Sequence, residues 1–210
     1  MTVSNFAALG LAEPILRSLS LRKLERPTPI QAAAIPPVLA GRDLLGIAET
    51  GAGKTDAFVL PLLQRLAEDG RTAPRNGARA IVLAPTPDRA ERIETSIAAV
   101  APNLRLSVFS LFGGARRGTQ IARLVRGVDI LVATPERALD LAQGGHLRLG
   151  TLSGFVLDAT DRMLETDASD AVRRIVGMLP DKRQALLFAT TLPAAVTSLA
   201  ASLLRDPVRV

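Results

Sequence analysis

Ala48-Glu49-Thr50-Gly51-Ala52-Gly53-Lys54-Thr55 is the stretch that decides the fold of this 210-residue chain. It follows the apolar run 43–47, which is typical of a strand, and it precedes residues 56–66, whose apolar side chains recur at helical spacing. A glycine-rich turn between a strand and a helix gathers backbone N–H groups and the positive end of the helix dipole at one point. The stretch therefore predicts a site for phosphate oxygens.

Two side chains of this loop have specific expected roles. Lys54 adds a positive charge to the anion site, and the hydroxyl of Thr55 is placed to hold a magnesium ion. The strict phosphate-loop pattern has Gly where Ala48 stands, so the loop is a variant of it. A plain glycine turn with an ordinary surface lysine is the alternative. The expected phosphate contacts are Thr50, Gly51, Ala52, Gly53, Lys54 and Thr55.

The composition excludes several classes of site. With no cysteine, the chain has no disulfide, no thiol chemistry and no cysteine-based zinc site, and one histidine makes no metal cluster. No run approaches the roughly 18 apolar residues of a membrane span, and the first residues lack a signal-peptide pattern. We therefore expect a cytoplasmic protein without a membrane partner. The net charge of +6 permits nucleic-acid binding, but genome composition explains it equally well.

The rest of the chain alternates between β-rich apolar runs and helical patterns. Several runs are apolar on both faces, as a parallel sheet covered by helices requires. The pattern predicts an α/β fold with a doubly wound, mostly parallel sheet and helices on both faces, whose ligands bind at the carboxyl ends of the strands. Expected strands are 43–47, 80–84, 105–111, 129–132, 154–157 and 184–188, and expected helices are 56–66, 91–100, 119–125, 136–142, 171–178 and 194–204.

The first forty residues form a separate, mostly helical lead-in. Helical patterns cover residues 11–19 and 30–39, and Pro29 and Thr28 mark the start of the second, with the proline in its first turn and the threonine as its cap. We therefore divide the chain into a lead-in, 1–40, and an α/β domain, 41–210.

Taken together, these segments resemble the N-terminal RecA-like domain of the DEAD-box RNA helicases, a family of phosphate-loop NTPases. The resemblance covers the chain from Phe6 to Val210 and rests on ordered motifs at family-like spacing. It implies a RecA-like fold, ATP or ADP with magnesium as the cofactors, RNA as a partner, and ATP hydrolysis as the reaction class.

The first motif of the resemblance is Arg26-Pro-Thr-Pro-Ile-Gln31, which is similar to the adenine-reading Q motif. A glutamine amide offers a donor and an acceptor that complement N6–H and N7 of adenine. Phe6 lies at the upstream spacing where the family stacks an aromatic ring on the base. The resemblance thus adds Phe6, Arg26 and Gln31 to the nucleotide contacts, whereas a simple helix cap is the alternative for Gln31.

The second motif, Asp158-Ala159-Thr160-Asp161, aligns with Asp-Glu-Ala-Asp of the family. Asp158 follows a buried strand and, with Thr55, is expected to hold the magnesium ion. The catalytic set implied by the resemblance is Lys54, Asp158 and Asp161. The family's glutamate, which activates the attacking water, is replaced by Ala159, so we expect impaired hydrolysis. Acidic residues that merely favour a helix N-terminus are the alternative.

RNA contacts in the family come from loops on the same edge, mainly to phosphate and sugar. Pro85-Thr86-Pro87-Asp88-Arg89 corresponds to Pro-Thr-Arg-Glu-Leu, so the motif's arginine is missing and Arg89 is displaced from its place by two positions. In Thr134-Pro-Glu-Arg137 a glutamate replaces a glycine. We expect weak RNA binding. Arg116 and Arg117 are candidate compensating charges, and a solvated basic helix start is the alternative for them. The expected contacts are Thr86, Gly113, Gly114, Thr134 and Arg137.

The last motif, Ala189-Thr190-Thr191, stands where the family has Ser-Ala-Thr and couples nucleotide state to the movement of two domains. Thr191 is kept and is the expected coupling residue. The sequence stops at residues 206–210, where the family passes into a second RecA-like domain. We expect that domain, its arginine finger and half of the RNA track to lie outside this chain.

Three functions remain open from the sequence. The chain is the nucleotide-binding half of an ATP-dependent RNA helicase, a catalytically inactive helicase-like module that binds nucleotide and serves interactions, or an unrelated phosphate-loop enzyme such as a small-molecule kinase or GTPase. Gln31 and the order of the motifs argue against the third.

Overall fold

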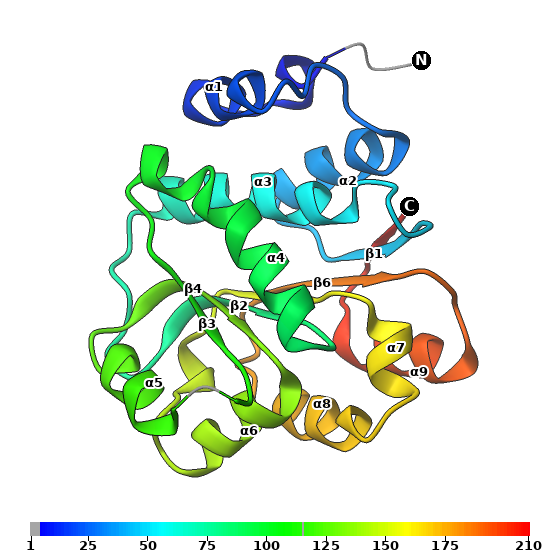
Figure 1. Ribbon diagram of the computed structural model, residues 1–210. Coiled ribbons are helices and arrows are strands. Elements are labelled where there is room, and N and C mark those ends of the chain that lie inside the picture. The colour runs from blue at the N-terminus through cyan, green and yellow to red at the C-terminus, as the bar shows by residue number, and fades with distance from the viewer. Residues whose placement is uncertain (1–4, 115) are drawn as a thin grey trace.

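A seven-stranded parallel sheet forms the centre of the computed structural model, which describes residues 5–114 and 116–210 (Figure 1). The strand order is β3-β4-β2-β5-β6-β1-β7, and every pair is parallel. This arrangement confirms the expected doubly wound α/β fold. The strands are β1 (Leu44–Ile47), β2 (Ala78–Leu83), β3 (Val108–Leu111), β4 (Val128–Ala133), β5 (Gly154–Leu157), β6 (Gln184–Ala189) and β7 (Val208–Arg209).

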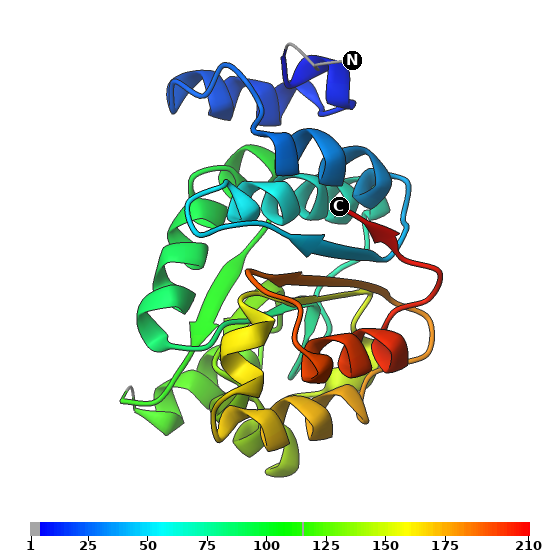
Figure 2. The same cartoon turned by 90° about the vertical axis from the view of Figure 1, so that its right-hand side faces the viewer.

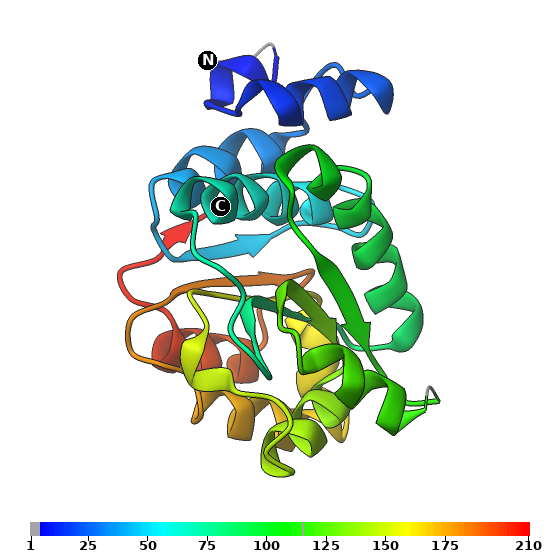
Figure 3. The ribbon, with the colours of Figure 1, turned by 90° about the vertical axis from the view of Figure 1, so that its left-hand side faces the viewer.

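Helices cover both faces of the sheet (Figures 2 and 3). One face carries α2 (Pro29–Leu39), α3 (Lys54–Asp69) and α4 (Pro87–Ala98), with α1 (Glu13–Leu21) as an outer layer. The opposite face of the sheet carries α5 (Arg117–Leu124), α6 (Pro135–Gln143), α8 (Ala168–Val176) and α9 (Ala194–Leu203), with the short α7 (Thr160–Leu164) at the edge. None of the helices formed by the described residues is long and apolar enough to cross a membrane. Single 3₁₀ turns lie at Ala7–Leu9, Ala101–Leu104 and Leu149–Thr151.

The inner strands of the sheet are buried on both sides because their side chains alternate between two hydrophobic cores. In β2, Ala80 and Val82 belong to the core beneath α2, α3 and α4, whereas Ile81 and Leu83 belong to the opposite core. All four are fully buried. A sheet covered on both faces explains why these strands appear in the sequence as continuous apolar runs.

The lead-in packs on the same core as the sheet domain. Ile15 of α1 and Ile35 of α2 are fully buried in one cluster with Phe58 of α3. The ring of Phe58 in turn contacts that of Phe188 in β6, with centroids 5.3 Å apart. The lead-in is thus held by apolar burial against α3, and the boundary at residue 40 stays a prediction.

Three details differ from the sequence expectation. The strand expected at 105–111 begins at Val108, because residues 101–104 form a 3₁₀ turn that Arg105 ends with a φ of +55°. The two-residue strand β7 and the five-residue helix α7 were not expected. The helix expected from residue 91 begins at Pro87, which places Arg89 in its first turn. This last difference changes the site.

All seven strands point in one direction, so the segments after them meet at one edge of the sheet. The loop after β1, the start of α4 after β2, the start of α7 after β5 and the segment after β6 are neighbours there. Four of the motifs found in the sequence therefore converge, although they are separated by up to about 140 residues in the chain.

Candidate functional site

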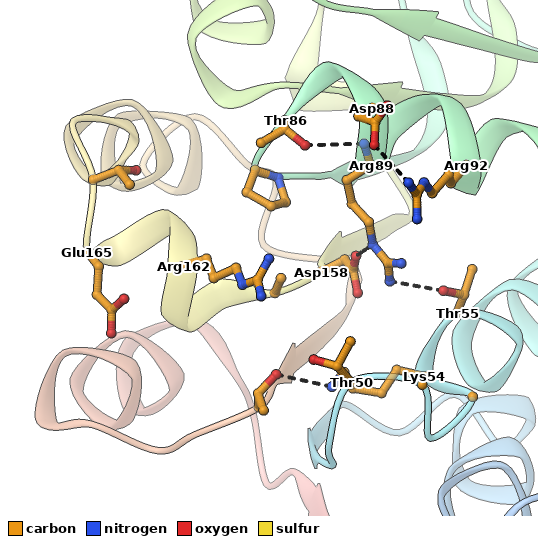
Figure 4. A pocket seen from close by; sticks show the side chains of 16 residues that line it. Thr50, Lys54, Thr55, Thr86, Asp88, Arg89, Arg92, Asp158, Arg162 and Glu165 are labelled. Atoms are coloured by element: carbon orange, nitrogen blue, oxygen red, sulfur yellow. Dashed lines mark hydrogen bonds and ion pairs between the residues drawn. The ribbon is translucent and has the colours of Figure 1, made fainter.

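A cavity of about 730 Å³ opens at the carboxyl edge of the sheet (Figure 4). Its walls come from the loop 50–55, from residues 85–92, from residues 158–166 and from Thr190. The predicted loop residues Thr50, Gly51, Gly53, Lys54 and Thr55 all line it, and Ala52 lies half-buried in the same loop.

The glycines of the loop are required by its backbone. Gly51 and Gly53 have φ values of +86° and +93°, in the left-handed region that favours glycine. A Cβ atom on Gly53 would lie 2.5 Å from Nε2 of Gln31 and 2.8 Å from Oγ1 of Thr28. The glycine thus lets the start of α2 pack directly on the loop.

Lys54 is buried, with 8% of its surface exposed, and its ammonium group holds the loop closed. Nζ donates to the carbonyl oxygens of Ala48 and Glu49 and, over 3.3 Å, to Oγ1 of Thr190. Burial lowers the pKa of Lys54, and the positive charge of Arg89 lowers it further, against the attraction of nearby carboxylates. The side chain is a cation fixed at the floor of the cavity.

Gln31 caps α2 with one end of its amide and connects the helix to this loop with the other. Oε1 accepts a hydrogen bond from the backbone N–H of Thr28 at 2.9 Å, and Nε2 donates to the carbonyl oxygen of Gly53 at 3.2 Å. The helix cap that the sequence offered as an alternative is therefore present. Within the part of the chain that the structure describes, the cavity lining includes neither Gln31 nor Arg26, which is exposed, nor Phe6, which is 4% exposed in the core.

An arginine lies between the two side chains predicted to hold a metal ion. Nε of Arg89 donates to Oδ2 of Asp158 at 2.5 Å, and Nη2 donates to Oγ1 of Thr55 at 3.0 Å (Figure 4). Asp158 is fully buried at the end of β5. The hydrogen bond to this carboxylate raises the pKa of Arg89, although burial opposes the shift.

Sequence reasoning missed Arg89 as a cavity residue and considered it only as a displaced RNA contact. The pair Thr86-Pro87 indicates where the helix that carries Arg89 begins. Thr86 is the N-cap of α4, and its Oγ1 accepts a hydrogen bond from the backbone N–H of Arg89 at 3.2 Å. A threonine cap followed by proline predicts a helix start at Pro87, which places the side chain of residue 89 over the strand edge.

Ala159, at the position of the family's glutamate, also lines the cavity. It has a φ of +53° and a ψ of 49°, the left-handed region that a non-glycine residue seldom adopts, and it is the N-cap of α7. Its methyl group accepts no proton. Among the described residues, none of the acidic and histidine side chains form a group of three or more that would hold a metal ion.

Asp161 is turned away from the cavity toward the segment after β6. Its Oδ2 accepts from the backbone N–H groups of Thr190 and Thr191, at 3.1 and 3.0 Å, and from the hydroxyl of Thr191 at 3.2 Å. Burial opposes its ionisation, but these hydrogen bonds outweigh it and hold its pKa below the ordinary value. The structure thus joins the predicted coupling residue, Thr191, to the acidic motif.

Four of the five predicted RNA contacts gather on a second part of the same edge. Gly113 and Gly114 are exposed after β3, and Thr134 is the buried N-cap of α6 after β4. Nη1 of Arg137 donates to Oε1 of Gln120 at 2.6 Å, and the amide of Gln120 donates to the carbonyl oxygen just before the glycine pair at 3.1 Å. Gln120 is therefore the link between the two motifs.

The other candidates for RNA contact are placed differently. Thr86 lines the cavity described above rather than lying beside the glycine pair. Arg117 donates to Asp140 at 3.0 Å, with both side chains 47% exposed, and Arg116 is exposed at the start of α5. The ion pair of Arg117 with Asp140 reduces the positive charge available to a partner.

Comparison with known proteins places this arrangement in one family. The family model described as DEAD/DEAH box helicase matches residues 28–199. The chain is 40% identical over 208 residues to the "ATP-dependent RNA helicase DeaD" of Escherichia coli and 37% identical over 211 residues to the "Pre-mRNA-processing ATP-dependent RNA helicase prp-5" of Neurospora crassa. Each match covers 99% of this chain but 32% and 18% of those relatives, respectively.

Proposed function

The chain belongs to the DEAD/DEAH box helicase family, and on this premise we propose that it binds an adenine nucleotide, ATP or ADP, in the cavity at the carboxyl edge of the sheet. The observation that carries the proposal is the closed glycine loop at the N-terminus of α3, with the ammonium group of Lys54 buried at the cavity floor. Backbone N–H groups and a fixed cation are the chemistry that binds a phosphate tail.

The charges around the cavity support a polyanionic ligand. Four cationic side chains line it, against three carboxylates. One carboxylate is engaged by Arg89 and a second, Asp88, by Arg92 at 3.0 Å. The remaining positive charge therefore favours phosphate over a neutral ligand. The four cationic residues are Lys54, Arg89, Arg92 and Arg162.

Adenine recognition is proposed for Gln31, which contacts the loop, together with Arg26 and Phe6, which lie outside the cavity lining. An amide has two N–H donors and two acceptor lone pairs, and the structure uses one of each on Thr28 and Gly53. One donor and one acceptor remain for the base, the pair that adenine complements. The cap thus fixes the orientation of the amide and does not exclude the base-reading role.

The predicted magnesium ligands do not fit a metal ion as they are arranged. The guanidinium of Arg89 lies between Thr55 and Asp158 and donates to Oγ1 and Oδ2, so a second cation between them meets a positive charge. Oδ1 of Asp158 has no hydrogen-bond partner among the described residues, but it is buried. The proposed function therefore assigns no role to magnesium.

Hydrolysis is proposed to be impaired. A positioned general base contributes about 10²–10⁴ in rate, and the base position holds Ala159. An arginine finger from elsewhere contributes about 10³–10⁵ in phosphoryl transfer, and the second RecA-like domain that would supply it is proposed to lie outside this chain. Asp161 positions the segment after β6 through Thr191 and is proposed to couple the two domains in the full-length protein.

RNA binding is proposed to be weak and independent of sequence. Gly113, Gly114, Thr134 and Arg137 form one contact area, and Thr86 a second beside the cavity. Backbone N–H groups and an arginine at such positions contact phosphate and sugar.

A nucleotide-binding interaction module without turnover is the second candidate function, and the position of Arg89 beside Asp158 favours it.

Calorimetry with ATP, ADP, AMP and GTP, followed by phosphate release with and without RNA, tests the proposal. We expect ATP and ADP to bind, AMP and GTP to bind at least tenfold more weakly, and phosphate release to remain near background with RNA. Equal affinity for GTP would contradict the adenine assignment, and efficient RNA-stimulated release would contradict impaired hydrolysis.

A further inference from the structure

We propose that Arg89 takes the place of the divalent cation, so that this chain binds the phosphate tail of an adenine nucleotide without magnesium. The inference rests on the proposed nucleotide binding and adds the identity of the counter-ion. It is drawn from the position of the guanidinium, which bridges Oγ1 of Thr55 and Oδ2 of Asp158 at the cavity wall.

The guanidinium has donors left for a ligand. An arginine carries five N–H donors in a rigid fork, and here Nε–H and one N–H of Nη2 are used by Asp158 and Thr55. The side chain is 33% exposed and lines the cavity, so the remaining donors are accessible from it. A planar fork of this kind matches two phosphate oxygens at once.

The guanidinium also engages one oxygen, Oδ2, of the carboxylate that a metal would need, whereas Oδ1 is buried without a hydrogen-bond partner among the described residues. Asp158 is fully buried, and its bond to Nε of Arg89 is 2.5 Å long. Magnesium requires near-octahedral oxygen ligands at about 2.0–2.1 Å, so a magnesium ion bound between Oδ2 of Asp158 and Thr55 would have to displace the arginine. Asp88 pairs with Arg92, so a displaced guanidinium would share the cavity with the metal, Lys54 and Arg162. Repulsion between these like charges disfavours that arrangement.

Two further contacts restrict the movement of this arginine. Its backbone N–H donates to the capping hydroxyl of Thr86, which fixes the first turn of α4. Its Nη2 is held by Thr55, the residue after the phosphate-loop lysine. The cation is thereby attached to both the helix and the loop that lie on either side of the ligand, and it is in place before the ligand binds.

Calorimetry of ADP binding with magnesium and with EDTA tests the inference on the unchanged protein. We expect the two dissociation constants to differ by less than about threefold, because the bridging cation belongs to the chain. A dissociation constant at least tenfold weaker in EDTA would overturn the inference, since it would mean that a metal displaces the guanidinium on binding.

Arg89→Leu places the residue of the family motif at this position and should make ADP binding depend on magnesium. It removes a charge-assisted hydrogen bond to phosphate and frees Thr55 and Asp158, so we expect ADP to bind about tenfold or more weakly in EDTA, with the loss recovered by magnesium. Arg205→Leu is the matched control. Arg205 pairs with Asp181 at 3.2 Å before β6, at the opposite edge of the sheet, and its loss should leave both constants unchanged.

Arg89→Lys keeps a positive charge without the fork and serves if the leucine variant does not fold, as judged by its thermal transition. We expect intermediate affinity in EDTA. Affinity equal to that of the leucine variant in both conditions would contradict a role for the charge. Absence of ADP binding by the unchanged protein in either condition would overturn the proposed function itself, whereas tight binding that requires magnesium would overturn only the exchange of cations.

Discussion

The two walls of the cavity differ in how much of the family pattern they keep. The wall formed by the loop after β1 has the glycine conformations, the buried lysine and the helix start that a phosphate loop needs. The facing wall is formed by the segments after β2, β5 and β6. In it, Arg89 donates a hydrogen bond to Asp158, Ala159 occupies the position of the general base, and Thr190 accepts a hydrogen bond from Lys54.

The difference separates binding from chemistry. In the proposed function, phosphate binding depends on the first wall, whereas metal binding and water activation would depend on the second, where Arg89 engages Asp158 and Ala159 occupies the base position. A chain with one wall kept and one replaced is expected to hold a nucleotide without cleaving it. Substitutions on each wall can therefore test the two halves independently.

Restoring the second wall should have the largest effect. We expect Ala159→Glu alone to give little phosphate release, because Arg89 still occupies the carboxylate, and Ala159→Glu with Arg89→Leu to gain about 10²-fold or more over the single variant. Single-turnover phosphate release with ATP, RNA and magnesium measures both. Ala159→Glu combined with Arg205→Leu is the control. A single variant as active as the double one would mean that Arg89 does not obstruct the site.

Removing the cation of the first wall comes next. Lys54→Ala should weaken ADP binding about 10–100-fold, since it deletes a charged donor to phosphate. Ala159→Ser, on the facing wall, should change the affinity less than about twofold. Calorimetry measures both affinities. Equal losses for the two variants would mean that the phosphate loop is misassigned.

Asp161→Asn tests the contact between the acidic motif and the segment after β6. We expect it to lower the free energy of unfolding by about 1–3 kcal/mol at neutral pH, because it weakens three hydrogen bonds to a buried carboxylate. Denaturant titration measures the change. Asp170→Asn, whose carboxylate is 77% exposed beside Arg174, should cost much less.

The pH dependence of Asp161→Asn follows from the lowered pKa of Asp161 in the folded state. The stabilisation by the ionised carboxylate is present above the unfolded pKa of about 3.9 and is lost as the pH falls through the lower folded pKa. The difference in stability between the unchanged protein and the variant should therefore shrink in acid below that range. A difference that stays constant down to the acid transition would contradict the role of the charge.

The smallest effect is expected at the contact between the walls. Thr190→Val keeps the shape of the side chain but removes the acceptor for Nζ of Lys54, so we expect a loss of about 0.5–1.5 kcal/mol in stability and less than a twofold change in ADP affinity. Thermal or denaturant unfolding measures the first. A tenfold loss of ADP affinity would show that Thr190 has a larger part in the nucleotide site than its hydrogen bond indicates.

The sequence predicted the fold and the first wall well because both depend on local patterns. Glycines at Gly51 and Gly53, after an apolar strand and before a helix, specify the loop through backbone conformation alone. The inner strands β1, β2, β4, β5 and β6 were visible because a sheet buried on both faces requires continuous apolar runs. The two-residue β7 was too short to give such a pattern.

The second wall was predictable only in part, since it depends on how far side chains reach between elements. Asp158 and Ala159 were placed by the strand before them, but the partner of Asp158 lies 69 residues away on α4. A guanidinium reaches across several ångströms, and no periodicity in the sequence shows where its end lies. The contacts of Thr190 with Lys54 and of Gln31 with Gly53 are of the same kind.

Crystals grown with ADP and manganese, measured at the manganese absorption edge, test the central claim most directly. We predict a bound nucleotide, no anomalous peak between Thr55 and Asp158, and the guanidinium of Arg89 in contact with the phosphate tail. A manganese peak bonded to Asp158, with Arg89 turned out of the cavity, would contradict it.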